Sequence, residues 1–181
     1  FRKYGLPRAI LTDNGSPWGC DAEHRHTSLT VWLMCLGIDA LHSRVYHPQT
    51  LGKDERFHRT MKAEVVHECR DREMSECQRL FDRWRVLYNT ERPHEALGMR
   101  VPAECYSVSG REYPERVREW EYSPSDAVRK VQQGGIISYR NKEWRVGKAF
   151  KGQSVGIRPS EEDGKLNVFF RNFKIAQIDL L

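Results

Sequence analysis

The segment 107–126 divides the sequence into two parts whose patterns differ. It holds two prolines, one glycine and four serines among many charged residues, a composition typical of a linker. Before it, apolar residues recur mainly at helical spacing, whereas after it they fall in short β-rich runs separated by turn residues. The sequence therefore predicts an α/β domain over residues 1–106, a linker over 107–126 and a small β domain over 127–181.

Bulk composition limits the class of protein. The chain has 181 residues, 39% of them hydrophobic, which suffices for one domain and a smaller companion. It contains no apolar run of the roughly 18 residues that a membrane span needs, and no signal-peptide pattern opens it. We therefore expect a soluble, cytoplasmic protein without a membrane partner. Because residue 1 is Phe rather than Met, we also expect the numbering to begin inside a longer chain.

The cysteines are odd in number and lack zinc-finger spacing, so we expect reduced thiols, as in other cytosolic proteins. Cys20 with His24 and His26 is the one cluster that suggests a metal site. Its polar neighbours favour a solvated loop instead. The five cysteines are Cys20, Cys35, Cys69, Cys77 and Cys105.

Asp13 is the first candidate site residue. It directly follows the β-rich run 8–12 and precedes Asn14-Gly15, a strong turn signal. A carboxylate in this place is presented at the carboxyl end of a strand, where α/β proteins bind ligands. Asp-Asn-Gly is also ordinary turn chemistry, so the position alone leaves a functional and a structural interpretation open.

Glu55 is the second candidate, in the first turn of a helix that follows the polar loop 47–52. The helix dipole stabilises a carboxylate there, so the position is also common without function. Basic side chains nearby suit a carboxylate that binds a divalent cation while its neighbours hold DNA phosphates; a solvated helix with compensating charges is the alternative. These candidate DNA-binding residues are Lys53, Arg56, Arg59 and Lys62, with Arg59 and Lys62 at i+4 and i+7 from Glu55.

Local signals predict the other elements of the first part. The expected helices are 27–36, capped by Thr27 or Ser28 and ended by Gly37, the helix of Glu55 with its apolar stripe Phe57, Met61 and Val65, and a helix over about 75–89. A second strand is expected over 38–46, and an irregular segment with one further turn over 96–106.

The second part is expected to form five short strands that close into a small β-barrel. Lys and Arg balance Asp and Glu at 19 to 19 in residues 1–125, but exceed them by 11 to 6 in residues 126–181. The net charge of +5 therefore comes wholly from this module. Such an excess favours binding to the DNA backbone, although basic modules of this size also bind proteins.

Three motifs, in this order, resemble the integrase-core transposases of bacterial insertion sequences and, more distantly, retroviral integrases. They are YGLPRAILTDNGSPW, YHPQTLGKDERFHRTMKAE and RWRVLYNTERPHEALGMRVPAECY, and they cover about the first 106 residues. The resemblance implies a ribonuclease H-like fold in which an Asp, a second Asp and a Glu hold two Mg²⁺ or Mn²⁺ ions. The second Asp matches Asp13, and the Glu matches Glu55 rather than the adjacent Asp54, because of its spacing from Gly52.

The family's activity is cleavage and joining of DNA strands, so the resemblance implies a polynucleotidyl transferase of transposition or integration. Its partners would be transposon ends and target DNA, its form a homo-oligomer, and its location the bacterial nucleoid. Arg59 and Lys62 fall where the family's helix touches DNA. The Arg92-Pro93-His94 segment is also typical of these transposases, and we expect it to be structural or to flank the DNA.

The sequence departs from the family in two ways. Asp13 and Glu55 enclose a slightly longer interval than in retroviral enzymes, and residues 1–12 contain no acidic residue. The first catalytic Asp is therefore expected upstream of Phe1, which would leave an incomplete site here. Two alternatives stay open: a non-catalytic DNA-binding or assembly remnant of a transposase, and a ribonuclease H-like nuclease without strand transfer.

Overall fold

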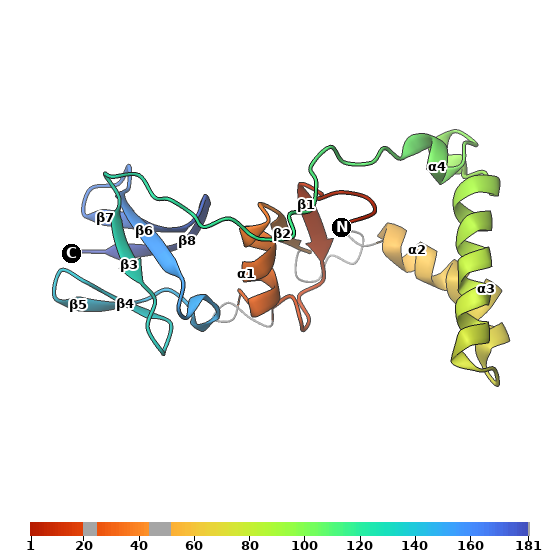
Figure 1. The fold of residues 1–181 in the computed structure, drawn as a ribbon, viewed down its shortest axis with the longest axis horizontal. Coiled ribbons are helices and arrows are strands. Elements are labelled where there is room, and N and C mark those ends of the chain that lie inside the picture. The colour runs from red at the N-terminus through yellow and green to blue at the C-terminus, as the bar shows by residue number, and fades with distance from the viewer. Residues whose placement is uncertain (20–24, 44–51, 181) are drawn as a thin grey trace. The chain divides into compact units, whose positions relative to one another are not determined.

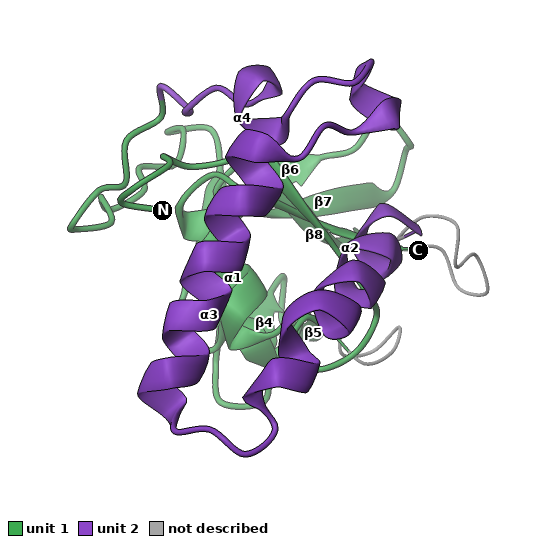
Figure 2. Cartoon of the chain, turned by 90° about the vertical axis from the view of Figure 1, so that its right-hand side faces the viewer, with its two compact units in different colours: residues 1–45, 111–181 green, residues 46–110 purple. Residues whose placement is uncertain are grey.

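The computed structural model describes residues 1–19, 25–43 and 52–180, which fall into two units. Unit 1 combines residues 1–45 with 111–181, and unit 2 spans residues 46–110 (Figure 2). The two ends of the sequence thus belong to one unit, while the helical segment between them forms the other. No helix within the described ranges is long and apolar enough to cross a membrane.

The N-terminal part of unit 1 is a β–α–β arrangement (Figure 1). Strand β1, Ala9–Thr12, pairs in parallel with β2, Asp39–His42, so that Ala9 lies beside Asp39 and Thr12 beside His42. Helix α1, Ser28–Cys35, connects them. The predicted strand over 8–12 and helix over 27–36 are confirmed, as is the part of the second strand that lies within the described residues.

Helix α1 begins and ends where the local sequence predicts. The Thr27 hydroxyl accepts a hydrogen bond from the Thr30 amide, and the Thr30 hydroxyl accepts one from the Thr27 amide, which forms a capping box. At the other end Gly37 adopts φ 66°, a left-handed conformation that favours glycine. Both signals are readable from neighbouring residues alone.

The C-terminal part of unit 1 contains six strands rather than the expected five. Strands β3, β6, β7 and β8 form an antiparallel sheet in that order, and β4 and β5 form a separate hairpin. The described residues therefore show an open sheet and a hairpin, not the closed barrel that we predicted. The strands are β3 (Ala127–Lys130), β4 (Ile136–Tyr139), β5 (Lys142–Arg145), β6 (Ser154–Pro159), β7 (Lys165–Phe170) and β8 (Phe173–Asp179), with a short helical turn, η6 (Lys148–Phe150), after β5.

One hydrophobic core joins α1 to these strands. Val31 and Met34 of the helix belong to the same buried cluster as Phe150, Val155 and other side chains of the C-terminal strands. A second, smaller cluster packs α1 against the N-terminal strands and contains Leu6, Leu33, Leu36 and Ile38. Helix α1 is therefore buried on two sides, and the C-terminal strands share its core.

The segment 111–122, called the connecting segment below, is fastened along unit 1. The Arg111 guanidinium donates hydrogen bonds to the carbonyls of Pro7 (2.7 Å), Leu36 (2.9 Å) and Gly37 (2.8 Å). Arg171, from the turn between β7 and β8, donates to the carbonyls of Cys35 and Arg118, both at 2.9 Å. Two cations thus satisfy carbonyls at the C-terminal end of α1, which otherwise lack partners.

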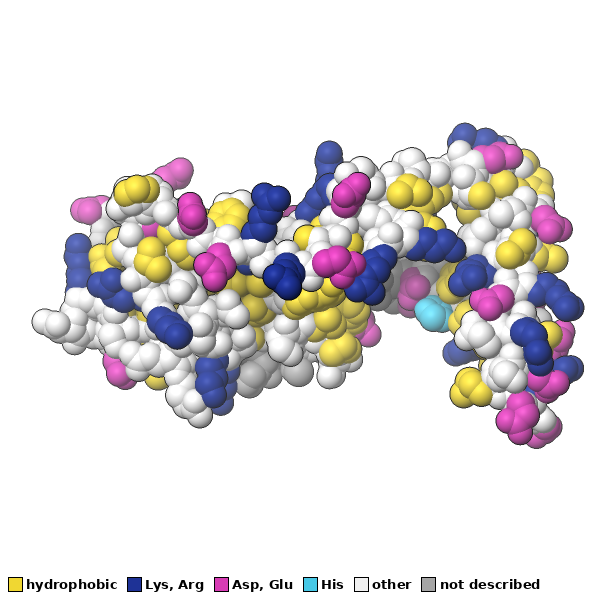
Figure 3. All heavy atoms as spheres, viewed as in Figure 1, with side chains coloured by type: hydrophobic (Ala, Val, Ile, Leu, Met, Phe, Trp, Pro, Cys, Tyr) yellow, Lys and Arg dark blue, Asp and Glu magenta, His cyan; other side chains and the backbone are white. Residues whose placement is uncertain are grey.

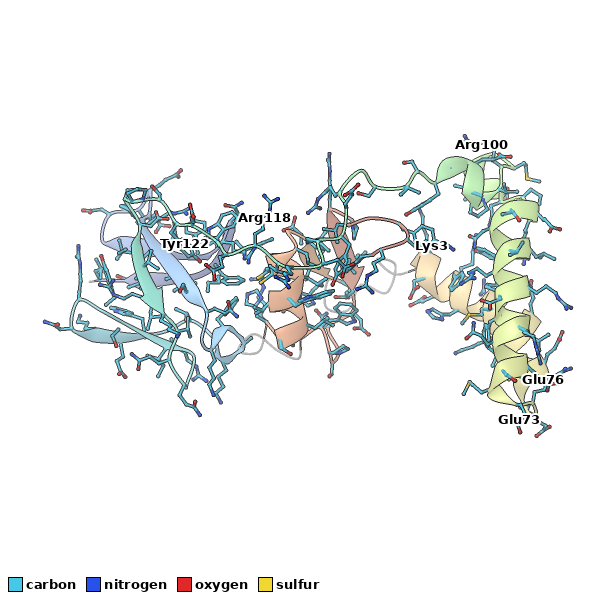
Figure 4. All side chains as sticks on the ribbon, in the orientation of Figure 1. Lys3, Glu73, Glu76, Arg100, Arg118 and Tyr122 are labelled. Atoms are coloured by element: carbon cyan, nitrogen blue, oxygen red, sulfur yellow. The ribbon has the colours of Figure 1, made fainter. Side chains whose placement is uncertain are left out.

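Tyr122 fixes the end of the connecting segment; Figure 4 labels it together with Arg118. Its hydroxyl donates to the Ser154 carbonyl at 2.7 Å and accepts from the Arg171 amide at 3.0 Å. Burial raises the pKa of this phenol above its ordinary value. The aromatic ring lies against Gly156 of β6, where a side chain would collide with it.

Unit 2 is helical. Helix α2, Gly52–Met61, continues through a π-helical turn, Lys62–Val66, and a 3₁₀ turn, His67–Cys69. Helix α3, Met74–Val86, likewise continues through a π-helical turn, Leu87–Glu91. A 3₁₀ turn, Glu95–Leu97, and the short helix α4, Pro102–Cys105, complete the unit. The predicted helices are confirmed, and the predicted further turn in the irregular segment is α4.

An aromatic cluster holds the two long helices together. The rings of Phe57 and Trp84 lie 5.5 Å apart, and those of Tyr88 and His94 lie 4.7 Å apart. Glu64 accepts hydrogen bonds from Trp84 Nε1 at 2.8 Å and from Arg92 Nη1 at 2.6 Å, and these bonds lower the pKa of its carboxyl. The Arg92-Pro93-His94 segment therefore packs on the helices, which supports the structural interpretation of that motif.

Candidate functional site

Asp13 lies where the sequence predicted, immediately after β1. Because β1 and β2 are parallel, their carboxyl ends meet at one edge of the sheet, and Asp13 is exposed at that edge. Its Oδ1 accepts a hydrogen bond from the Gly15 amide at 3.1 Å, so the Asp-Asn-Gly segment forms a tight turn. The carboxylate therefore serves the turn and remains accessible.

His42 and Asn14 hold the chain around Asp13, and the sequence analysis did not select either of them. The His42 Nδ1 atom lies 3.3 Å from the Asp13 carbonyl oxygen and 3.5 Å from the Thr12 hydroxyl. The Asn14 side chain donates to the Ser43 carbonyl at 3.0 Å. Both contacts bridge the ends of β1 and β2, so only the parallel register of the two strands would have indicated them.

Glu55 lies in the first turn of α2 and is exposed, as predicted. The competing carboxylate, Asp54, is already engaged, because its Oδ2 lies 3.4 Å from His58 Nε2 one turn along the helix. Glu55 takes part in no ion pair of the described residues. Of the two adjacent acids, Glu55 is thus the one whose carboxylate is unengaged within the helix.

The four predicted basic residues line the same helix and its continuation. Arg59 follows Glu55 by four residues, and Lys62 follows it by seven at the start of the π-helical turn. Within the part of the chain that is described, none of the four is in an ion pair, so their charges stay available to an anionic partner. Lys53, Arg56, Arg59 and Lys62 are all exposed.

The two predicted metal ligands lie in different units. Asp13 belongs to unit 1 and Glu55 to unit 2, and each is described within its own unit. Across residues 1–19, 25–43 and 52–180, no group of three His, Cys, Asp or Glu side chains could hold a metal ion. The donor chemistry of two exposed carboxylates suits Mg²⁺ or Mn²⁺. Each unit thus supplies one of the two predicted ligands.

The alternative metal cluster receives no support from its one described member. Cys20 and His24 lie outside the described residues. His26 packs edge-on against the buried ring of Phe150, with 5.2 Å between the centroids. Burial lowers the pKa of this imidazole to about 4, with a further contribution from the charge of Arg25. His26 therefore belongs to the edge of the core. The four cysteines within the described residues are free thiols.

Comparisons with known proteins agree with the motifs. Residues 36–102 match the family model described as Integrase core domain, and residues 126–181 match the C-terminal domain of IS481 family transposases. The first match includes Glu55 and the four basic residues, while Asp13 precedes it. The resemblance to integrase-core transposases is confirmed, the core match implies a ribonuclease H-like fold, and both matches support a function in DNA transposition.

A relative among known proteins extends the similarity beyond these two segments. Uncharacterized protein K02A2.6 of Caenorhabditis elegans is 32% identical over 133 residues. These residues make up 72% of this chain and 9% of that protein. The chain thus spans a small part of the relative's length.

Proposed function

We propose, from the resemblance of this chain to integrase-core transposases, that it is part of an enzyme that cleaves DNA strands and joins their ends to target DNA. Asp13 and Glu55 are its proposed catalytic and metal-binding carboxylates. Lys53, Arg56, Arg59 and Lys62 are its proposed phosphate contacts. The observation that carries the proposal is the exposed carboxylate of Asp13 at the carboxyl end of β1, in the motif order of the family.

The position of Asp13 supports a role in ligand binding. The carboxyl edge of a parallel sheet is where open α/β folds bind their ligands. Here that edge is shaped by contacts between β1 and β2, since His42 and Asn14 each reach across from one strand end to the other. Asp13 is therefore presented on an ordered turn, as a metal ligand must be.

The helix of Glu55 supports the phosphate-binding role. Its unpaired basic side chains follow the carboxylate along one face at i+4 and i+7. The aromatic cluster of Phe57, Trp84 and Tyr88 packs this helix against α3, which gives the exposed face a rigid support. A divalent cation bound by carboxylates would activate a water or a DNA 3′-hydroxyl and stabilise the leaving oxygen.

Three further features are proposed on the resemblance alone. They are a third carboxylate on a strand upstream of residue 1, assembly as a homo-oligomer on paired DNA ends, and location at the bacterial nucleoid. The division into a core over 1–106, a linker over 107–126 and a C-terminal module over 127–181 also remains a proposal.

A non-catalytic DNA-binding or assembly remnant is the second candidate function. The lack of an acidic residue among residues 1–12, and so of a first catalytic Asp before Asp13, favours it. The two candidates differ in one property, because only the enzyme requires Asp13 and Glu55 to bind a divalent cation.

Calorimetric titration with Mn²⁺ tests the proposal on this chain, on a version extended upstream, and on Asp13→Asn and Glu55→Gln variants of both. Asp54→Asn is the matched control, because it removes the same charge one residue away. We expect tight binding by the extended protein, lost in Asp13→Asn and Glu55→Gln and kept in Asp54→Asn. Equal binding by all variants, or none by the extended protein, would favour the remnant.

Nicking of supercoiled plasmid DNA provides the second readout. The extended protein should nick DNA in the presence of Mn²⁺, and Glu55→Gln should abolish this activity without lowering the unfolding temperature, since Glu55 is exposed. Nicking that persists in both carboxylate variants would refute the assignment of the site.

A further inference from the structure

Two half-buried cysteines lie on either side of the turn between the long helices of unit 2. Cys69 ends the 3₁₀ turn that continues α2, and Cys77 is the fourth residue of α3. The residues between them, 70–76, are all exposed, and Figure 4 labels two of them, Glu73 and Glu76. Charged side chains of both signs lie over this end of unit 2 (Figure 3). The two thiols are therefore close to the surface and within reach of small reagents.

Hydrogen bonds of the turn hold Cys77 against the backbone of Cys69. The Cys77 thiol donates to the Cys69 carbonyl at 3.5 Å and lies 3.8 Å from the Arg72 carbonyl oxygen. The Cys69 carbonyl also accepts from the Arg72 amide at 3.3 Å, which folds the chain back after α2. At the start of α3 the Glu73 carbonyl accepts from the Cys77 amide at 3.0 Å. The geometry of the turn therefore brings the two cysteines together.

The two side chains also interact with each other. Partial burial raises the pKa of the Cys69 thiol, and a hydrogen bond with the Cys77 thiol raises it further, while the charge of Arg72 opposes both effects. A disulfide requires the two cysteines to approach closely, with their side chains directed toward each other. Cys77 meets this requirement, because its sulfur lies against the carbonyl of Cys69 and its thiol is hydrogen-bonded to the Cys69 thiol.

A pair of neighbouring thiols can act in two ways, as ligands of a thiophilic metal ion or as the two halves of a disulfide. A structural zinc site needs four protein ligands. Among the residues that the structure describes, no group of three His, Cys, Asp or Glu side chains could hold a metal ion. The pair in this turn therefore fits a reaction between two thiols better than a metal site.

We propose that Cys69 and Cys77 are a redox-active pair that a small-molecule disulfide, such as oxidised glutathione, converts reversibly into an intramolecular disulfide. One cysteine thiolate attacks the small disulfide, forms a mixed disulfide with one of its sulfurs and releases the other as a thiol. The second cysteine thiolate then attacks the cysteine sulfur of the mixed disulfide and releases the second small thiol. The protein loses two protons and two electrons, and one small disulfide is reduced to two thiols.

The bond would join the continuation of α2 to the first turns of α3. It closes a short loop, 69–77, and so restricts the unfolded chain. Disulfides of intracellular proteins are usually transient and act in catalysis or redox sensing, which is the behaviour expected of a pair that is reduced in the described structure. Oxidation should therefore stabilise the helical hairpin of unit 2. This proposal does not depend on the proposed function.

Peptide mapping of the whole chain tests the proposal. The protein is equilibrated with mixtures of reduced and oxidised glutathione, alkylated to block the remaining thiols, and digested with trypsin without reduction. Trypsin cleaves after Arg70 and Arg72, so the two cysteines leave in separate peptides, 63–70 and 73–79. These peptides stay joined only by a disulfide. We expect the joined pair in oxidising mixtures and the two alkylated peptides in reducing ones.

The same titration in concentrated urea separates the effect of the fold from that of proximity in the sequence. Two cysteines this near to each other in the sequence form some disulfide in any chain. If the turn brings the thiols together, the equilibrium constant with glutathione should be at least about tenfold larger for the folded chain than for the unfolded chain. An equal or smaller constant for the folded chain would overturn the proposal.

Two variants complete the test. Cys69→Ser should leave Cys77 as a mixed disulfide with glutathione and should abolish the dependence of the unfolding temperature on the redox mixture. Cys105→Ser is the matched control, because it removes an exposed cysteine of the same unit; it should keep the joined peptides and the higher unfolding temperature of the oxidised chain. Circular dichroism verifies that both variants fold. Joining of Cys77 to Cys105, or to a second chain, in place of Cys69 would contradict the assignment.

Discussion

Gly156 is the position at which the smallest substitution should have a large effect on stability. A Cβ atom on this residue of β6 would lie 2.6 Å from Cδ1 and 2.9 Å from Cε1 of Tyr122, and 3.2 Å from Oδ2 of Asp126. Contacts this short do not occur, so the ring has to move. Tyr122 would then lose its hydrogen bonds with the Ser154 carbonyl and the Arg171 amide.

The expected cost follows from these two effects. Overpacking of a fitted ring costs about 1–3 kcal/mol, and two displaced hydrogen bonds cost about 1 kcal/mol each. Replacing glycine by alanine recovers about 0.5–1 kcal/mol by restricting the unfolded chain. We therefore expect Gly156→Ala to lower the free energy of unfolding by about 2–4 kcal/mol.

Urea unfolding followed by tryptophan fluorescence measures this cost. Gly110→Ala is the matched control, because its Cβ would meet nothing within 4 Å and its φ is not positive; it should stay within about 0.5 kcal/mol of the parent. A Tyr122→Leu background removes the aromatic ring and so shows whether the ring causes the cost of Gly156→Ala. If Gly156→Ala costs as much in the Tyr122→Leu background as in the parent, the collision with the ring is not the cause and the reasoning is refuted.

Three further predictions concern contacts within unit 1. Arg111→Met removes three hydrogen bonds to carbonyls at the end of α1 and should cost about 2–3 kcal/mol in urea unfolding, whereas Arg116→Met, at an exposed position, should cost less than about 0.5 kcal/mol. The pKa of the His26 imidazole is lowered to about 4 in the folded protein, so on acidification the unfolded chain is protonated at this residue first. The neutral imidazole therefore contributes stability at pH 7 that is lost as pH falls from about 6.5 to 4. The expected loss is on the order of 1–2 kcal/mol after allowance for partial exposure. His26→Gln should flatten that part of the pH dependence, and an unchanged slope would exclude His26 as its source. Asp126→Asn should weaken the pair with Arg158 and lower the stability at neutral pH. The parent should lose this stability only in acid, because Arg158 lowers the pKa of the Asp126 carboxyl. Equal unfolding midpoints for parent and variant at pH 7 would contradict this.

The elements that were predicted correctly depend on signals within a few residues of one another. The Asp13-Asn14-Gly15 turn, the Thr27 cap and the stripe of Phe57, Met61 and Val65 are of this kind. Asp13 and Glu55 were placed at a strand end and a helix start for the same reason, and the structure places them there. Their assignment as metal ligands remains a prediction.

The errors concern pairing across long sequence intervals. Strand β3 pairs with β6, so that the β4–β5 hairpin lies outside the sheet that its neighbours in sequence form. The runs of apolar residues indicated strands but not their partners, because alternation defines which face a residue occupies and says nothing about which strand lies beside it. A closed barrel was therefore expected where the described residues show a sheet and a hairpin.

By itself, the sequence determined the local elements, the motif order of integrase-core transposases and the excess of charge in the second part. Only the tertiary structure decided that α1 shares a core with the C-terminal strands and that Arg111 and Arg171 reach the carbonyls at its end. It also decided which basic residues are unpaired, since Arg158 is neutralised by Asp126 while Arg140 and Lys142 lie on aromatic rings. The physical reason is that hydrogen-bond partners and ion pairs are chosen by distance in space, and residues separated by tens of positions carry no local signal of their contact.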